Sequence, residues 1–289
     1  MKKRSLGNQG VKQISTGILF VCATPLGNLE DISLRLQKTL GSVDIIFAED
    51  TNTTKILLEH LKIKKPLSSY HDHNKERSAQ KILEALLSGK DVALTSDAGT
   101  PGIADPGYFV VQKALKEKIQ IVPIPGPSAI ITALSASGLP TDKFSFEGFL
   151  PRKDKELSEY LTSIKQEKRT LVFYESPHRL LNSLEKFFQI FGDRQICIAR
   201  ELTKKFEEFY RGKLAGALDK FKKIDPRGEF TLILQGSPEV SADNIDDLKG
   251  LMLDLAKAGL SKKDTAKILS SHFDLSKNEL YEKLLEWEK

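Results

Sequence analysis

The sequence predicts an α/β protein with two α/β domains and a small helical segment at its C-terminal end. Short apolar runs alternate with helical patterns over the first 138 residues, as in a parallel sheet covered by helices. A second alternation follows Ser137-Gly138-Leu139-Pro140, and beyond residue 244 only helical patterns remain. At 289 residues the chain is long for one domain and comfortable for two.

The first domain is predicted over residues 17–138, behind a disordered basic tail at 1–16. Its apolar runs predict buried strands, each ending in a polar loop. Asp105-Pro106-Gly107 predicts a helix that is capped by Asp105 and has proline at its first position. Strands are expected at 18–23, 44–48, 67–70, 92–94 and 119–124, and helices at 33–40, 54–61, 75–87, 106–116 and 128–136.

The second domain is predicted over residues 139–238 and the helical domain over 239–289. Strands are expected at 170–174, 195–199 and 230–234, and a helix that Ser176-Pro177 caps runs to about Phe191. In the helical domain, Ser261 with Asp264 and Ser276 with Glu279 are capping-box signatures.

Charge is distributed unevenly along the chain. The net charge is +5, but from Ser241 onward eight lysines and ten acidic residues give −2, so the preceding part carries +7. A polyanionic partner should therefore contact residues before 241.

Two cysteines, Cys22 and Cys197, lie inside apolar runs and are expected to be buried, as in a reducing compartment. The apolar stretch Ile18–Ala23 is too short for a signal peptide, and no run has the length of a membrane helix. These features predict a cytoplasmic protein.

The stretch Asp91–Gly107, DVALTSDAGTPGIADPG, contains the densest signal for function. A buried strand leads into a loop crowded with Ser96, Asp97, Gly99 and further glycines and prolines. Glycine allows another group to approach the backbone closely, and such loops at strand ends bind ligands in open α/β sheets. A tight strand-to-helix turn is the alternative, but a turn alone needs only one or two such residues.

Two more loops, Thr24–Asn28 and Pro125–Ser128, follow candidate parallel strands, so the three loops should converge on one sheet edge. Their glycines, prolines and small side chains favour a nucleoside-bearing ligand. No phosphate-binding G-x-x-x-x-G-K-[ST] or G-x-G-x-x-G motif occurs.

A fourth stretch, Tyr174-Glu175-Ser176-Pro177-His178-Arg179, places an aromatic ring, an acid, an imidazole and a guanidinium on a strand-to-helix turn. An ordinary capped helix start is the alternative interpretation. The histidines of His71-Asp72-His73-Asn74 could be metal ligands, but no third ligand follows at a useful spacing, so we expect no metal. We interpret this stretch as a loop that lines the pocket.

Basic residues with interleaved aromatics occur from Arg152 to Arg227. This pattern favours binding of nucleic acid, because cations neutralise phosphates and aromatic rings stack on bases. A solvated face over core aromatics is the alternative.

Eight motifs, in order, resemble the ribosomal RNA small subunit methyltransferase I family, within the tetrapyrrole-methylase-like class. They are ATPLGNLEDI (23–32), AEDTNTT (48–54), YHDHNK (70–75), SDAGTPGIADPG (96–107), PIPGPSAIITALSASGLP (123–140), YESPHR (174–179), ARELTKKFEE (199–208) and GEFTLIL (228–234). The resemblance implies two α/β domains of the tetrapyrrole methylase type, a cofactor cleft between them, a homodimer and a helix-turn-helix-like tail. It further implies S-adenosylmethionine-dependent 2′-O-methylation of a decoding-centre cytidine of 16S rRNA, within the assembled small subunit.

The resemblance also implies roles for residues. Gly99-Thr100-Pro101 stands where the wider class has Gly-Asp-Pro, which argues against its porphyrinoid and diphthine branches. Glu175, His178 and Glu201 are candidates for a general base, and the sequence does not choose among them. The residues expected to bind the cofactor are Pro25, Leu26, Gly27, Ser96, Asp97, Gly99, Thr100, Ile103, Gly126, Ser128, Ala129, Tyr174 and Thr231. Those expected to bind RNA are Arg152, Lys153, Arg179, Arg200, Lys204 and Lys205.

Two competing hypotheses remain open. A non-catalytic RNA- or nucleotide-binding protein of the same fold would transfer no methyl group, and a small-molecule methylase would not need the basic excess. The tail is net acidic, which favours support of a dimer or domain over reading of a nucleic-acid groove.

Overall fold

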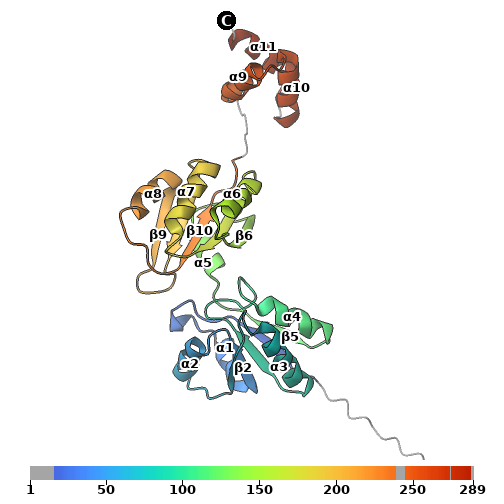
Figure 1. Cartoon of the computed structure of the whole chain (residues 1–289), viewed down its shortest axis with the longest axis vertical. Coiled ribbons are helices and arrows are strands. Elements are labelled where there is room, and N and C mark those ends of the chain that lie inside the picture. Colours follow the sequence, from blue (N-terminus) through green and yellow to red (C-terminus); the bar gives the residue numbers. More distant parts are fainter. Residues whose placement is uncertain (1–15, 239–244, 274, 288–289) are drawn as a thin grey trace, which may run out of the picture. The chain divides into compact units, whose positions relative to one another are not determined.

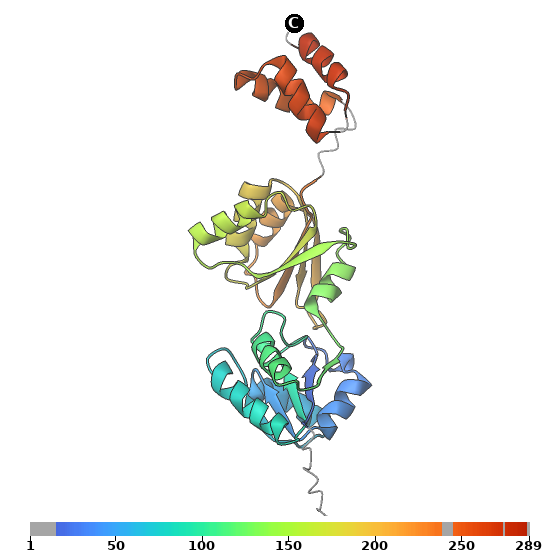
Figure 2. The same cartoon turned by 90° about the vertical axis from the view of Figure 1, so that its right-hand side faces the viewer.

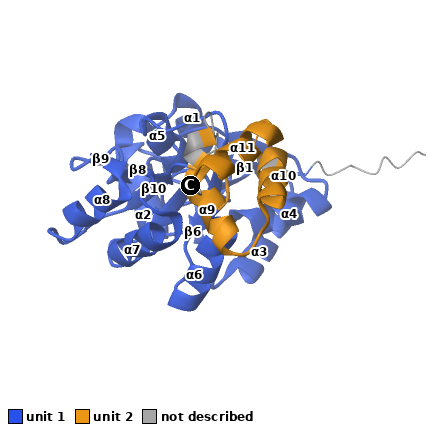
Figure 3. Ribbon diagram, turned by 90° about the horizontal axis from the view of Figure 1, so that it is seen from above, with its two compact units in different colours: residues 1–165, 169–235 blue, residues 166–168, 236–289 orange. Residues whose placement is uncertain are grey.

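The structure is a computed structural model that describes residues 16–238, 245–273 and 275–287. Residues 1–15 of the predicted tail and linker residues 239–244 lie outside this range. The described residues form two compact units, coloured separately in Figure 3. The first unit extends to Gln235 but excludes residues 166–168. The second unit consists of residues 166–168 and the chain from Gly236 onward.

The first unit contains two five-stranded sheets (Figure 1). In the first sheet all strands are parallel, in the order β3-β2-β4-β1-β5, as the alternating pattern predicts. The strands are β1 (Leu19–Cys22), β2 (Ile45–Ala48), β3 (Leu67–Ser69), β4 (Val92–Thr95) and β5 (Ile121–Ile124).

Helices cover both faces of this sheet because neighbouring residues of a strand point to opposite sides. Ala93 packs with residues of α1 (Leu34–Ser42) and α2 (Thr51–His60), after the 3-10 turn η1 (Leu29–Asp31). Val92 and Leu94 pack with α3 (Lys75–Leu87) and α4 (Gly107–Lys116). The helix after β4 therefore lies on one face of the sheet, whereas the helices after its neighbours β1 and β2 lie on the other. The carboxyl end of β4 is thus a topological switch point, where open α/β sheets bind ligands.

The second sheet has the order β6-β7-β10-β8-β9. β6 is parallel to β7, whereas the other neighbours are antiparallel. The strands are β6 (Phe144–Phe149), β7 (Thr170–Glu175), β8 (Gln195–Arg200), β9 (Glu208–Lys213) and β10 (Phe230–Leu234). Of these, β6 and β9 have no counterpart among the predicted strands.

One face of the second sheet is covered by α6 (Asp154–Ser163), α7 (Leu180–Phe191) and α8 (Leu214–Phe221). The opposite face packs against α5 (Ala129–Ser135), as Figure 2 shows, and against Leu26 from the loop after β1. The sequence places α5 with the first domain, yet its buried residues Ile130 and Ala133 belong to the core of the second sheet. This shared core holds the two sheets together within the first unit.

Two helix starts differ from the sequence expectation. Helix α7 begins at Leu180 rather than at Pro177, because residues 176–179 form a turn in which Ser176 O accepts from the N–H groups of Arg179 and Leu180. Helix α4 begins at Gly107, and Asp105 Oδ1 caps it from one residue further out by accepting from Gly107 N at 2.7 Å.

The second unit contains the 3-10 turn η2 (Ile245–Leu248) and helices α9 (Lys249–Lys257), α10 (Lys262–His272) and α11 (Lys277–Trp287) around a small apolar core. The predicted serine cap at α10 is confirmed, since Ser261 Oγ accepts from Asp264 N at 3.2 Å. Among the described helices of the chain, none is long and apolar enough to cross a lipid bilayer.

Both cysteines are buried, as predicted. Burial raises the pKa of the Cys22 thiol to about 12 and that of Cys197 to about 11. Both thiols therefore stay protonated and pack as small apolar groups.

Candidate active site

A cavity of about 420 Å³ lies where the loop after β4 faces β7 and β10 of the second sheet. We call it the Tyr174 cavity. Its size is that of an ordinary small-molecule site. Most residues that the sequence analysis assigns to a cofactor line it, namely Leu26, Ser96, Asp97, Gly99, Thr100, Ile103, Ser128, Ala129, Tyr174 and Thr231.

The loops after β1 and β4 converge, as predicted, through an isolated antiparallel bridge between Thr24 and Gly99. Thr24 N donates to Gly99 O at 2.8 Å, and Gly99 N donates to Thr24 O at 3.0 Å. Gly99 has a φ of +77°, a conformation that glycine adopts without strain. A Cβ atom there would lie 3.4 Å from Leu26 Cδ2, so the glycine keeps this part of the wall open.

An aromatic wall closes one side of the Tyr174 cavity. Tyr174 and Phe149 line it, with ring centroids 5.5 Å apart, and Phe146 packs edge-on against Tyr174 at 4.9 Å. Burial raises the pKa of Tyr174 to about 12, so the phenol stays neutral. With Ile103, whose side chain is also exposed toward solvent, this wall suits the flat face of a heterocycle.

The polar part of the lining contains several hydroxyl side chains and five carboxylates, namely Glu49, Asp97, Asp105, Glu175 and Glu229. Burial raises the pKa of Glu49, and repulsion by Asp97 and Asp105 adds to the effect. Burial likewise raises the pKa of Asp97, helped by repulsion from Asp50, Asp105 and Glu229. The cavity therefore has a negative potential and suits a cationic ligand.

The three candidate bases do not come together. Glu175 borders the Tyr174 cavity but is buried, and its oxygens accept hydrogen bonds from Ser183 Oγ at 2.5 Å and Ser176 N at 2.7 Å. His178 is exposed and lines neither cavity described here. Glu201 Oε1 accepts from Lys204 Nζ at 2.9 Å and from Glu229 N at 3.0 Å.

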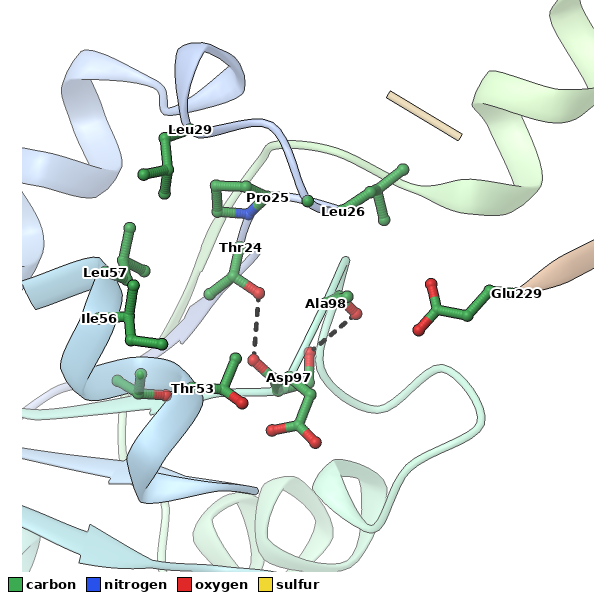
Figure 4. Close-up of a pocket in the computed structure, with 13 residues that line it drawn as sticks. Thr24, Pro25, Leu26, Leu29, Thr53, Ile56, Leu57, Asp97, Ala98 and Glu229 are labelled. Atoms are coloured by element: carbon green, nitrogen blue, oxygen red, sulfur yellow. Dashed lines mark hydrogen bonds between the residues drawn. The ribbon is translucent and has the colours of Figure 1, made fainter. Parts of the chain in front are cut away.

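A second cavity, of about 450 Å³, lies beside the first and is shown in Figure 4. We call it the Thr53 cavity. Pro25 and Gly27, which the sequence analysis groups with the cofactor residues, line only this cavity, together with residues of α2. Gly126 lines neither cavity, and a Cβ on it would lie 3.0 Å from Ala23 Cβ, which is a packing reason for glycine.

The predicted RNA-binding residues fall into two groups. Arg179 donates to the carbonyls of Leu150 at 3.0 Å and Pro151 at 2.6 Å, and Arg200 Nε donates to Arg227 O at 2.7 Å. Lys204 pairs with Glu201 and Glu229. Those three cations therefore hold parts of the chain together, whereas Arg152, Lys153 and Lys205 are exposed to solvent. Of these, Lys153 pairs with Glu156 at 2.8 Å on the surface.

Some cavity residues were missed by the sequence analysis, among them Glu49, Asp105, Phe149 and Glu229. Glu49 follows the buried run Ile45–Ala48 directly, so its place at the end of a parallel strand was a usable signal. Phe149 lies on β6, whose alternating Phe144-Ser145-Phe146-Glu147 was a usable strand signal, although a bulge between Phe146 and Gly148 shifts the register before Phe149. Glu229 precedes β10 inside the motif GEFTLIL, and its place in the site depends on the pairing of distant strands.

The His71–Asn74 stretch forms a turn before α3. Asn74 Oδ1 accepts from His71 N at 2.9 Å, and Asn74 Nδ2 lies 3.2 Å from His71 Nε2. None of these four residues lines either cavity, so the expectation of a pocket-lining loop is not met. No group of three or more His, Cys, Asp or Glu side chains suited to a metal occurs among the described residues.

Comparison with known proteins adds the following findings. The family of tetrapyrrole (corrin/porphyrin) methylases matches residues 19–217. Ribosomal RNA small subunit methyltransferase I of Halalkalibacterium halodurans is 50% identical over 223 residues, which cover 77% of each chain. The protein of the same name from Synechocystis sp. is 44% identical over 279 residues, covering 94% of this chain and 99% of that protein.

Solved structures resemble the fold. A cobalt precorrin-4 methyltransferase matches with a TM-score of 0.58 at 16% identity, covering 75% of this chain and 94% of that one. Uroporphyrin-III C-methyltransferase from Thermus thermophilus, complexed with S-adenosyl homocysteine, matches with a TM-score of 0.55 at 16% identity, covering 76% and 97%. At these identities the likeness concerns the fold alone.

Proposed function

The chain belongs to the ribosomal RNA small subunit methyltransferase I family of S-adenosylmethionine-dependent rRNA methyltransferases, and we propose that it methylates the ribose 2′-hydroxyl of a cytidine in the decoding centre of 16S rRNA. The observation that carries the proposal is the convergence of the family motifs on the Tyr174 cavity. Segments far apart in the sequence bring Gly99, Ser128 and Tyr174 to one cavity, whose volume of about 420 Å³ is that of an ordinary ligand site.

The residues of the Tyr174 cavity fit S-adenosylmethionine. The aromatic and aliphatic wall of Tyr174, Phe149 and Ile103 suits an adenine ring. The carboxylates suit the positive charges on the sulfur and the amine, since opposite charges attract strongly in a partly enclosed site. When bound, the cofactor supplies a methyl group on a positively charged sulfur, ready for transfer to an oxygen nucleophile.

The chain's own contribution is to orient the hydroxyl, exclude water and accept a proton. Among the three candidate bases of the sequence analysis, Glu201 and His178 line neither cavity. Glu175 lines only the Tyr174 cavity and is buried, with hydrogen bonds to both of its oxygens. Asp97 lines both cavities. We place the proton acceptor there, because its raised pKa makes the carboxylate a stronger base than an ordinary aspartate.

The basic excess before residue 241 supports an rRNA substrate over a porphyrinoid one. The proposed setting is the assembled small subunit in the cytoplasm, with the protein as a homodimer. The small-subunit setting and the homodimer rest on the family resemblance. Light scattering of the purified full chain measures the oligomeric state directly.

The function is tested by mass spectrometry of 16S rRNA from cells with and without the gene, together with methyl transfer in vitro from labelled S-adenosylmethionine to small subunits from the deletion strain. A ribose methyl group on the cytidine only in cells with the gene is the expected result. Label that appears on a base instead would contradict the 2′-hydroxyl assignment, and no label on rRNA would contradict the whole proposal.

A further inference from the structure

We propose that the Thr53 cavity receives the target nucleoside, base and ribose together, while the cofactor occupies the neighbouring Tyr174 cavity. The inference rests on the proposed function, because it assigns the two ligands of that reaction to two separate cavities. It also moves Pro25 and Gly27 from the cofactor site, where the sequence analysis put them, to the target site.

The first observation is that the two cavities share a wall. Leu26, Ser96, Asp97, Ala98 and Glu229 line both. Group transfer needs its two reactants within about 3–3.5 Å of each other, which only adjoining sites allow. The cofactor in one cavity and the nucleoside in the other would meet at this shared wall, and Asp97 would then lie beside the reacting hydroxyl.

The second observation is the chemistry of the Thr53 cavity. Leu29, Ile56 and Leu57 form one apolar side, and Glu229 points its carboxylate inward from the opposite side (Figure 4). Ile56 is 63% exposed although it is a large aliphatic residue on a short amphipathic helix. Ile56 therefore presents an aliphatic face inside a concave site, where a ligand can cover it.

Charge identifies which part of a nucleotide enters. None of the residues that line the Thr53 cavity, all of them in the described part of the chain, is Lys, Arg or His. Asp97 and Glu229 would repel a phosphate, whereas a neutral base can lie on the apolar side and ribose hydroxyls can donate to the carboxylates. The cavity therefore suits a nucleoside whose flanking phosphates stay outside.

Lys204 lies beside this cavity, already paired with Glu201 and Glu229, so a flanking phosphate would have to compete with these carboxylates for its charge. The stem of Lys204 fills the space next to Gly27, where a Cβ atom would lie 2.7 Å from Lys204 Cγ. Its amine pairs with Glu229 Oε2 at 3.0 Å. Enzymes that modify a single nucleotide in structured nucleic acid extrude it into a pocket, and the backbone then lies across the pocket's edge.

The experiment uses three variants of the full chain. Thr53→Trp fills the Thr53 cavity from an exposed position on α2, and Ile56→Asp removes the apolar side and adds a charge. Glu59→Trp, on the same helix but outside the lining, is the matched control. For each protein we would measure kcat/KM for small subunits from the deletion strain, the Kd for S-adenosylmethionine by calorimetry and the melting temperature.

We expect Thr53→Trp and Ile56→Asp to lose about 100-fold in kcat/KM, with Kd for S-adenosylmethionine within about twofold of wild type because neither residue lines the Tyr174 cavity. Glu59→Trp should match the wild type in both. Undiminished kcat/KM in both cavity variants would overturn the assignment, and a parallel loss of cofactor affinity would assign the cavity to the cofactor instead. A wild-type protein that methylates no rRNA would overturn the proposed function and this inference together.

Discussion

The backbone N–H of Asp97 donates a 3.2 Å hydrogen bond to Oε2 of Glu49, so two carboxylate residues from neighbouring strand ends are tied together at the mouth of the site. Asp97 Oδ1 in turn accepts from Asp50 N at 2.9 Å. The loops after β2 and β4 are thereby joined, although the negative charges they carry repel each other. This repulsion has consequences for both stability and catalysis.

For stability, we predict that Glu49→Gln stabilises the protein at neutral pH. The raised pKa of Glu49 means that its carboxyl group binds a proton more tightly in the folded protein than in the unfolded chain. Above the ordinary value of 4.5, ionisation therefore costs folding free energy, and stability falls as pH rises toward the folded-state pKa. Glutamine keeps an oxygen to accept from Asp97 N and removes the charge.

Thermal melts from pH 3.5 to 8 test this prediction. The melting temperature of Glu49→Gln should exceed that of the wild type by about 2 °C at pH 7, and the difference should vanish below the ordinary pKa of 4.5. A variant that is less stable than the wild type at pH 7 would show that the hydrogen bond to the charged oxygen outweighs the repulsion.

For catalysis, we predict that Asp97→Asn lowers kcat about 100-fold, since loss of a general base has effects of this size. Only the ionised carboxylate accepts a proton, so the wild-type rate should rise with pH through the pKa of Asp97, above its ordinary value of 3.8. The amide variant should lack this acid limb. Single-turnover rates against pH measure both effects.

Cofactor affinity is the control for this variant. Because asparagine retains an oxygen that can accept from Asp50 N, the loop should keep its place. A Kd for S-adenosylmethionine that rises as much as kcat falls would make Asp97 a binding residue and remove it as the proton acceptor.

Gly99→Val should weaken S-adenosylmethionine binding about tenfold, equivalent to 1.4 kcal/mol, because the added side chain would enter the Tyr174 cavity beside Leu26. Valine at a φ of +77° also strains the backbone, which lowers the melting temperature. Gly138→Val provides the matched control, since Gly138 has a φ of +76° but no atom within 4 Å of its added Cβ. Equal cofactor affinity in the two folded variants would remove Gly99 from the site.

Glu175→Ala should destabilise the protein by about 3 kcal/mol, because it leaves a buried partner without its carboxylate. Ser183 Oγ loses its acceptor, and Arg179 loses a charge 3.8 Å away. Glu185→Ala, which removes a half-exposed partner of Lys222, should cost no more than about 0.5 kcal/mol. Urea unfolding measures both, and similar values for the two variants would mean that Glu175 is no structural anchor.

The last prediction concerns the surface that meets RNA. Arg152 and Lys153 are exposed, so reversing both charges should weaken binding of small subunits and reduce the salt slope by about 2, one for each lost phosphate contact. Reversal at Lys262 and Lys263, in the net acidic tail, should do much less. The test is the affinity of each variant for small subunits, measured across a series of salt concentrations. A larger loss of affinity in the tail variant would make the helical segment the RNA-contacting part.

Much of the fold was predictable because its signals are local. Apolar runs such as Ile45–Ala48 and Val92–Leu94, followed by polar loops, indicate parallel strands and the edge at which those loops meet. The glycines and prolines between Ser96 and Gly107 marked that edge as a ligand site. Family motifs then pointed to most of the residues that line the Tyr174 cavity.

Only the tertiary structure decided which polar groups are available for chemistry. Glu175 and Glu201 have the residue type of a base, but Ser183 and Lys204 occupy their oxygens. The partner of a carboxylate is set by contacts between distant segments, whereas sequence patterns report only the local period of burial. The same reason explains why Glu229, from the second sheet, joins Asp97 at the wall between two cavities.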